Sequence, residues 1–165
     1  YGMGSAKMAA QLGITQQAAE DKIKQFLAAY PAVERFTKEA VAETERTGYA
    51  FTVLGRRRNI PEIMSRNRKD RSRGERLAVN TQIQGSAADV VKMAQINYDR
   101  STYERDYGCK MLLQVHDELV FECPKEHSAF MCQEIKRLMM HPFSLDFAVE
   151  LEVDGGVGAT WGDAK

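Results

Sequence analysis

The stretch QVHDELVFE, residues 114–122, places three polar residues between two apolar runs. The run MLLQV, residues 111–115, precedes them, and LVF, residues 119–121, follows them. Two apolar runs separated by a short polar group are typical of a β-hairpin whose strands are buried and whose turn is exposed. The sequence therefore predicts a hairpin over residues 111–123, with His116, Asp117 and Glu118 at its tip.

The segments on both sides of this hairpin predict helices and one further strand. A long helix is expected from about Glu75 to Tyr98, and a second helix follows the hairpin, around residues 130–139. Residues 147–154 alternate apolar and polar side chains, as expected of a half-buried strand with an acidic outer face. Helices followed by antiparallel strands, with helices packed behind the strands, define an α+β fold.

The N-terminal third predicts two amphipathic helices and a hairpin. The first helix starts near Thr15 and ends at Pro31, and the second stops near Gly48. Residues 49–54 are expected to form a strand that turns at Gly55 into Arg56, Arg57 and Arg58. The segment 60–73 is expected to be an extended loop with short helical turns.

The composition is that of one globular domain or of a compact piece of a larger protein. The 165 residues are 44% hydrophobic and 28% charged, and no apolar run approaches the roughly 18 residues of a membrane helix. No signal peptide is recognised, and the chain starts with Tyr1 and not with methionine, which suggests a fragment. Three cysteines without a CxxC pair predict reduced thiols and no structural zinc site. Reduced thiols indicate an intracellular protein, either cytoplasmic and nucleoid-associated or encoded by a phage.

Charge is unevenly distributed, although the net charge is zero. Residues 56–76 carry nine Arg or Lys against three acidic residues, whereas residues 101–165 carry six basic against twelve acidic residues. The basic stretch is mostly arginine, whose planar guanidinium can form two parallel hydrogen bonds with phosphate or carboxylate. It fits either a solvated surface or a surface that binds a polyanion.

One face of the predicted long helix is polar. Arg76, Asn80 and Gln84 follow one another at intervals of four, which places them in one row. Their side chains offer donors for phosphate, sugar or base-edge acceptors, and an ordinary exposed face is the alternative. Gly85 in this helix costs about 1 kcal/mol relative to alanine, which indicates close approach by another group.

The carboxylates at the predicted hairpin tip suit a divalent cation. Mg²⁺ prefers oxygen ligands, takes one or two protein carboxylates and keeps several waters. Asp117 and Glu118 need not act equally, because neighbours at a tight tip can point in different directions. A plain polar turn is the alternative. A hydrolytic triad that includes His116 is disfavoured, because no serine or cysteine stands in a nucleophile context such as GxSxG.

Several stretches together resemble DNA polymerase family A, the family of bacterial DNA polymerase I and its phage relatives. QVHDELVFE resembles motif C of this family, and GYAFTVLGRRRNIP, residues 48–61, resembles its arginine-rich hairpin. GERLAVNTQIQGSAADVVK, residues 74–92, is similar to a further family segment. YGMG, residues 1–4, resembles the end of the nucleotide-binding finger helix, and Trp161 stands where the family has a C-terminal tryptophan.

The resemblance implies a fold, a reaction and a metal. Residues 1–48 would be the C-terminal, helical part of the fingers, and residues 49–165 a portion of the palm. The reaction would be template-directed nucleotidyl transfer by DNA polymerase, with two Mg²⁺ ions in the complete active site. Asp117 would be a catalytic, metal-binding aspartate, and Glu118 an adjacent catalytic carboxylate of less importance.

The resemblance also implies where DNA and nucleotide bind. Contacts with the template–primer are implied for Arg76, Asn80, Gln84, Gln114 and His116. Tyr1 would lie beside the templating base, and Gly2 would let the backbone turn there, so these two residues would bind nucleotide.

The same resemblance implies that the chain alone is inactive. The family's other catalytic aspartate and its triphosphate-binding residues lie before the segment that matches YGMG, so about half of an active site is expected here. The implied partners are primer–template DNA, deoxynucleoside triphosphates and the remainder of the polymerase, with no membrane. Two alternatives remain: a subunit of a naturally split polymerase, and a non-catalytic DNA-binding module derived from one.

Overall fold

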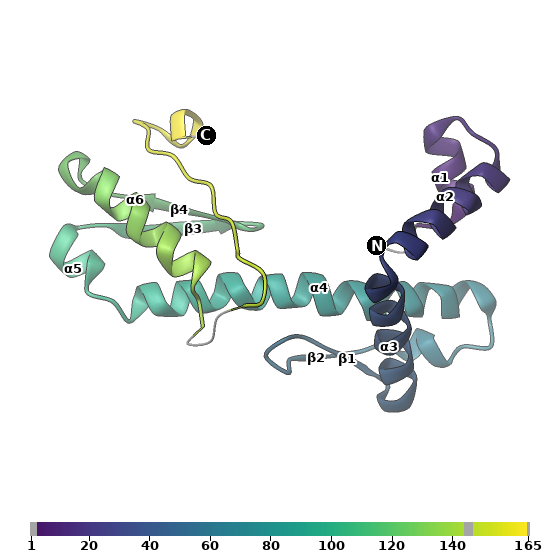
Figure 1. The fold of residues 1–165 in the computed structure, drawn as a ribbon. Helices are drawn as coiled ribbons and strands as arrows, with labels where there is room; N and C mark the ends of the chain where they lie inside the picture. The colour runs from purple at the N-terminus through teal and green to yellow at the C-terminus, as the bar shows by residue number, and fades with distance from the viewer. Residues whose placement is uncertain (1–2, 144–146, 165) are drawn as a thin grey trace. The chain divides into compact units, whose positions relative to one another are not determined.

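Helices and two short hairpins make up the part of the chain that the computed structural model describes, residues 3–143 and 147–164 (Figure 1). The chain divides into two compact units, residues 1–86 and residues 87–165. Each sheet is a single antiparallel pair of strands, so the predicted α+β class is confirmed. No described helix is long and apolar enough to span a membrane.

The first unit begins with three helices, α1 (Ser5–Leu12), α2 (Gln16–Ala29) and α3 (Pro31–Thr47). The predicted signals act as expected: the Thr15 hydroxyl accepts a hydrogen bond from the backbone N–H of Ala18 at 3.2 Å and caps α2. Pro31 opens α3, where its missing N–H costs nothing. Gly48 ends α3 with a φ of 79°, a left-handed conformation that suits glycine.

The arginine-rich hairpin follows, with β1 (Tyr49–Phe51) paired to β2 (Arg57–Asn59). β1 is shorter than the predicted strand 49–54. The backbone N–H of Thr52 donates to the Arg56 carbonyl at 2.9 Å, and that of Gly55 donates to the Thr52 carbonyl at 2.9 Å. The chain therefore turns at residues 53–54, inside the predicted strand. Behind the hairpin, a small core contains four fully buried side chains, namely Ala50, Ile60, Ile63 and Ala78.

A long helix, α4 (Arg68–Asp99), starts seven residues before the predicted position. The segment 60–73, predicted as a loop with short helical turns, contains one such turn, the 3₁₀ turn η1 (Pro61–Met64). Its last six residues, 68–73, belong to α4 instead of a loop. Asn67 caps α4, since its Oδ1 accepts from the backbone N–H of Lys69 at 2.9 Å. Arg71 then bonds Glu45 of α3 at 2.5 Å and lies 3.6 Å from Glu75. These contacts let a densely charged segment stay helical.

Gly74 is where α4 passes closest to η1. A Cβ added to Gly74 would lie 2.6 Å from the Ile63 nitrogen and 2.9 Å from the Glu62 carbonyl carbon. Both neighbours are backbone atoms, so Gly74→Ala should lower the free energy of unfolding by about 1–3 kcal/mol. This loss should exceed the gain of about 1 kcal/mol in helix propensity. Urea unfolding followed by circular dichroism measures the change.

Gly4→Ala is the matched control, because nothing lies within 4 Å of a Cβ added there. It should shift the unfolding midpoint only slightly. A Gly74→Ala variant as stable as the parent chain would contradict the close packing of α4 on η1.

The second unit is built on the hairpin predicted from residues 111–123. β3 (Lys110–Val115) pairs with β4 (Glu118–Glu122), and a bulge leaves Leu112 without a partner of its own. α6 (Lys125–Met140), which was predicted, and the short α5 (Tyr103–Tyr107), which was not, complete the unit (Figure 1). The core of this unit contains Tyr98, Cys109 and Met131.

Residues 147–154 do not form the predicted strand. The alternation persists as burial only in the second half of the segment, where Leu151 and Val153 are half-buried while Glu152 and Asp154 are exposed; Val149 is 77% exposed. A strand also needs a neighbouring backbone to share its hydrogen bonds, and neither described sheet extends to this segment. The chain continues as coil to a 3₁₀ turn, η2 (Trp161–Ala164).

Candidate functional site

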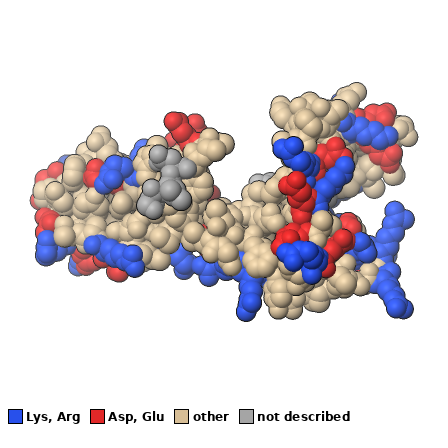
Figure 2. Space-filling view, turned by 60° about the horizontal axis from the view of Figure 1, so that its bottom comes forward, with Lys and Arg blue, Asp and Glu red and all other residues tan. Residues whose placement is uncertain are grey.

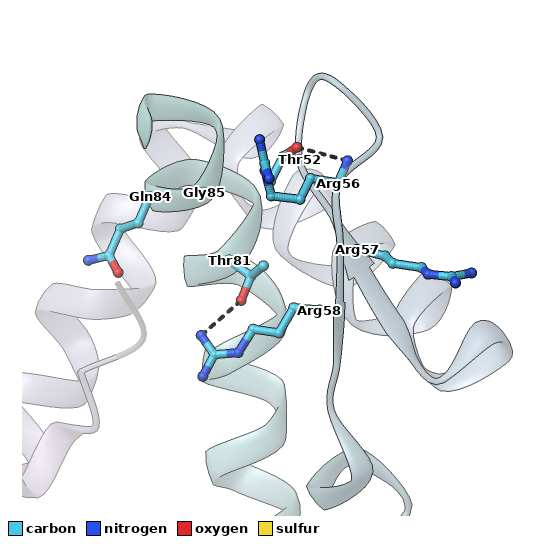
Figure 3. A pocket seen from close by; sticks show the side chains of 7 residues that line it. All are labelled: Thr52, Arg56, Arg57, Arg58, Thr81, Gln84 and Gly85. Atoms are coloured by element: carbon cyan, nitrogen blue, oxygen red, sulfur yellow. Dashed lines mark hydrogen bonds between the residues drawn. The ribbon is translucent and has the colours of Figure 1, made fainter. Parts of the chain in front are cut away.

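In the first unit, the arginine-rich hairpin and α4 enclose a pocket of about 280 Å³. Its lining comes from the turn and β2 on one side and from one face of α4 on the other (Figure 3). The lining residues are Thr52, Arg56, Arg57, Arg58, Thr81, Gln84 and Gly85. Two features predicted separately, the arginine cluster and the polar helix face, therefore meet in one hollow.

The arginines of β2 point in different directions. Arg58 reaches α4, where its Nη1 donates to the Thr81 hydroxyl at 3.4 Å (Figure 3). Arg57 points to the other side of the strand, and its guanidinium lies 5.4 Å from the centre of the Tyr49 ring. This alternation follows from the pleat of a strand.

The close approach expected at Gly85 is made by the hairpin of the same chain. A Cβ at Gly85 would lie 2.7 Å from the Thr52 methyl carbon. The next residue, Ser86, accepts a hydrogen bond from the backbone N–H of Val53 at 2.9 Å. The hairpin turn thus rests on α4, and this contact forms one wall of the pocket.

The polar row on α4 continues beyond this pocket. Arg76 is exposed, and its Nη1 donates to the Ser72 hydroxyl at 3.0 Å. It lines a second, shallow hollow of about 690 Å³, together with residues 67–69 and Ser72. On the face drawn in Figure 2, several Lys and Arg side chains stand out with no acidic side chain beside them. Such cations are available to an anionic ligand.

Asn80 occupies the middle of the row, one helical turn from Arg76 and from Gln84. Its Oδ1 is buried and has no hydrogen-bond partner among the described residues. A buried acceptor left unpaired typically costs about 1–3 kcal/mol. A group that donates to Asn80 would remove this cost.

In the second unit, the tip of the β3–β4 hairpin is a two-residue turn, His116 and Asp117. His116 has a φ of 54°, in the left-handed region that few residues other than glycine occupy. The Nε2 of Gln114 donates to the His116 carbonyl at 2.7 Å, and the Nε2 of Gln95 on α4 donates to the Gln114 Oε1 at 3.0 Å. This chain of amide bonds ties the tip to α4.

The two carboxylates at the tip differ in their partners. Glu118 accepts a hydrogen bond from the indole N–H of Trp161 at 2.5 Å. Asp117 is exposed and makes no hydrogen bond or ion pair within the described part of the chain. The tip therefore holds one engaged carboxylate and one that is available to a ligand.

The two carboxylates at the tip are suitable ligands for Mg²⁺, although they are only part of a full ligand set. Asp117 and Glu118 supply the hard oxygen ligands that this cation prefers, on a turn held by the amide bonds and by Trp161. Within residues 3–143 and 147–164, the tip included, no group of three or more His, Cys, Asp or Glu side chains could hold a metal ion. Further oxygen ligands must then come from substrate, water or another part of the protein.

The cysteines are free thiols, as predicted. Cys109 and Cys123 lie at the base of the hairpin, directly before β3 and after β4. Burial, together with hydrogen bonding to Cys109, raises the pKa of Cys123 to about 11. Cys123 packs against the core of this unit, and the raised pKa agrees with a packing role.

A model of the family described as DNA polymerase family A matches residues 1–163. The chain belongs to DNA polymerase family A. Within this family, it is similar to DNA polymerase I of Bacillus subtilis, with 41% identity over 165 residues. It is also similar to DNA polymerase I of Treponema pallidum, with 40% identity over 163 residues.

A solved structure has the same fold. It is described as the POL domain of Pol1 from M. smegmatis in complex with DNA primer-template and dNTP. The TM-score is 0.89 at 38% identity, over 98% of this chain and 28% of that one. The present chain spans 18% of the B. subtilis polymerase and 16% of the T. pallidum polymerase.

Sequence reasoning located the polar row and the hairpin tip but missed two of the contacts that hold the tip. Trp161 was noticed only through the family resemblance, and nothing in the local pattern pointed to Gln95. The amide of Gln114, expected to face DNA, is exposed but already bonded within the chain. Tyr1 and Gly2 lie outside the described residues.

Proposed function

We propose that this chain is the C-terminal fingers-and-palm part of a DNA-directed DNA polymerase that performs template-directed nucleotidyl transfer. The observation that carries the proposal is the available Asp117 carboxylate on a braced hairpin tip, in a chain that belongs to DNA polymerase family A. Residues 1–48 are assigned to the fingers and residues 49–165 to the palm. This functional boundary lies inside the first compact unit.

The hairpin tip is assigned the metal-binding step. Asp117 would hold Mg²⁺, with Glu118, which accepts a hydrogen bond from Trp161, as a supporting carboxylate. The chemistry that Mg²⁺ would supply there is activation of the primer 3′-hydroxyl and stabilisation of the leaving pyrophosphate, with two ions in the complete active site. The remaining ligands come from the rest of the polymerase and from the nucleotide.

The polar residues are assigned to the other substrates. Arg76, Asn80 and Gln84 contact the template–primer from one face of α4, and His116 approaches the primer terminus. Gln114 acts on DNA through the tip that it braces, and Tyr1 with Gly2 forms part of the nucleotide site. Two observations favour DNA over a plain solvated face: the exposed Arg76, and the pocket that Gln84 shares with the arginine-rich hairpin.

DNA affinity tests this assignment. Arg76→Ala should weaken primer–template binding by about 1–3 kcal/mol, because it removes a charged donor from the polar row. Arg58→Ala should act in the same direction, since Arg58 lines the pocket. Affinity should also fall steeply as salt rises, because each phosphate contact releases counterions. Fluorescence anisotropy with a labelled primer–template, at several salt concentrations, gives these values.

Lys24→Ala supplies the control for loss of charge alone. Lys24 is an exposed cation on α2 with no assigned contact to DNA, so its removal should change affinity little. Equal effects of the Lys24, Arg58 and Arg76 substitutions, or binding that is flat with salt, would mean that the polar row is an ordinary surface.

A further inference from the structure

The C-terminal segment folds into a compact turn that carries Trp161. A Cβ at Gly156 would overlap the Ala164 carbonyl oxygen, and one at Gly158 would lie 2.6 Å from the Asp163 carbonyl carbon. Only glycines let the two backbones approach this closely. The segment is thus closed on itself, and η2 has a fixed place within it.

Side-chain bonds hold this turn further. The Oδ2 of Asp163 accepts hydrogen bonds from the Thr160 hydroxyl at 2.7 Å and from the Thr160 backbone N–H at 3.2 Å. Upstream, Gly155 lies against α6, where an added Cβ would come within 2.9 Å of the Lys136 side chain. The segment thus passes beside α6 and is braced internally, which holds the backbone that carries Trp161.

The indole reaches the hairpin tip across 43 residues of sequence and donates its N–H to Glu118 Oε1. Glu118 is the first residue of β4 and pairs with Val115, so its backbone is fixed by the ladder. An indole N–H only donates and a carboxylate oxygen accepts, so the two groups are complementary. The contact therefore fixes the direction of the Glu118 side chain.

We propose that Trp161 is a positioning residue for the metal-binding tip: its indole N–H fixes Glu118, so that the tip presents Asp117 and Glu118 to a divalent cation in one arrangement. This inference rests on the polymerase function proposed above. It adds a role for the C-terminal turn, which contains no carboxylate assigned to the metal.

Two readouts test it, and the first uses the 165-residue chain directly. Trp161 is the sole tryptophan of the sequence, so intrinsic fluorescence reports on this contact. Glu118→Ala should shift the emission maximum and increase quenching by acrylamide. Glu118→Gln keeps an oxygen acceptor and should leave both close to the parent values, as should Glu122→Ala, an exposed carboxylate on the same strand. No response to Glu118→Ala would overturn the contact.

The second readout is the Mg²⁺ dependence of nucleotide incorporation by the complete polymerase. Residues that orient a metal ligand typically contribute about 10- to 100-fold to metal affinity or activity. Trp161→Phe keeps the ring and removes the N–H, so it should raise the Mg²⁺ concentration for half-maximal incorporation about tenfold, with DNA affinity unchanged. A purely structural turn would not change this concentration.

A double-mutant cycle tests the positioning role of Trp161 separately from the proposed polymerase function. Trp161→Phe and Glu118→Ala should be non-additive, because each removes the same contact, whereas Trp161→Phe and Glu122→Ala should add. Additive effects with Glu118, or an unchanged Mg²⁺ dependence, would overturn the positioning role while leaving polymerase function intact. Undiminished incorporation by Asp117→Asn would instead overturn the polymerase mechanism itself.

Discussion

Asp117→Asn is expected to lower the single-turnover rate of nucleotide incorporation by at least about 10²–10³ in the complete polymerase. Loss of one strong electrostatic stabiliser of a transition state typically costs this much, and a metal ligand should cost no less. DNA affinity should change little, because the group acts on charge that develops in the transition state. Rapid-quench incorporation, with DNA affinity measured in parallel, gives both numbers.

The structure makes this substitution a clean one. Asp117 has no hydrogen-bond or ion-pair partner in the described residues, and asparagine keeps its size, so the hairpin should fold normally. Glu118→Gln is the matched comparison and should be clearly milder, because Glu118 is engaged by Trp161 and an amide oxygen can still accept that hydrogen bond. Near-normal turnover by Asp117→Asn would show that the hairpin is purely structural.

The isolated 165-residue chain is expected not to extend a primer in the presence of Mg²⁺. It corresponds to 18% of the B. subtilis DNA polymerase I, and the family resemblance assigns a second catalytic aspartate and the triphosphate-binding residues to another segment. Its rate should fall at least about 10³-fold below that of the complete polymerase, since losing even one stabiliser costs about 10²–10³. Gel-resolved primer extension measures this directly.

Adding the rest of the polymerase distinguishes the remaining possibilities. Activity restored by a separately produced remainder would support a split enzyme, and activity only in one contiguous chain would support a segment of an ordinary polymerase. DNA binding without activity in either arrangement would support a non-catalytic module. Robust extension by the 165-residue chain alone would contradict the assignment of half an active site.

Sequence predicted the elements that are set by local signals. Thr15, Pro31 and Gly48 each determine a helix end through their own backbone or side-chain chemistry, and the structure has helix ends at all three. The start of α4 also has a local signal, the capping side chain of Asn67, but the charge density of the residues that follow favoured a loop. A contact distant in sequence supports this start, since Arg71 reaches Glu45, 26 residues earlier in the chain.

In the candidate site, too, some features are set by local sequence and others by contacts between distant residues. The spacing of Arg76, Asn80 and Gln84 fixes their common helix face, and the apolar runs fix the hairpin tip. The bracing of that tip comes from residues distant in sequence: Gln95 lies 19 residues from Gln114. Periodicity describes one element at a time, so contacts between elements of this kind are invisible to it.

The unpaired Leu112 in β3 constrains how this part of the chain can change over time. Side chains alternate between the two faces of a strand, so gaining or losing one residue turns over every side chain that follows. Between Leu112 and the tip, such a change would move the Gln114 side chain to the opposite face of β3 and break its hydrogen bond with Gln95. A single-residue insertion or deletion here should therefore disturb the tip more than a substitution of similar size.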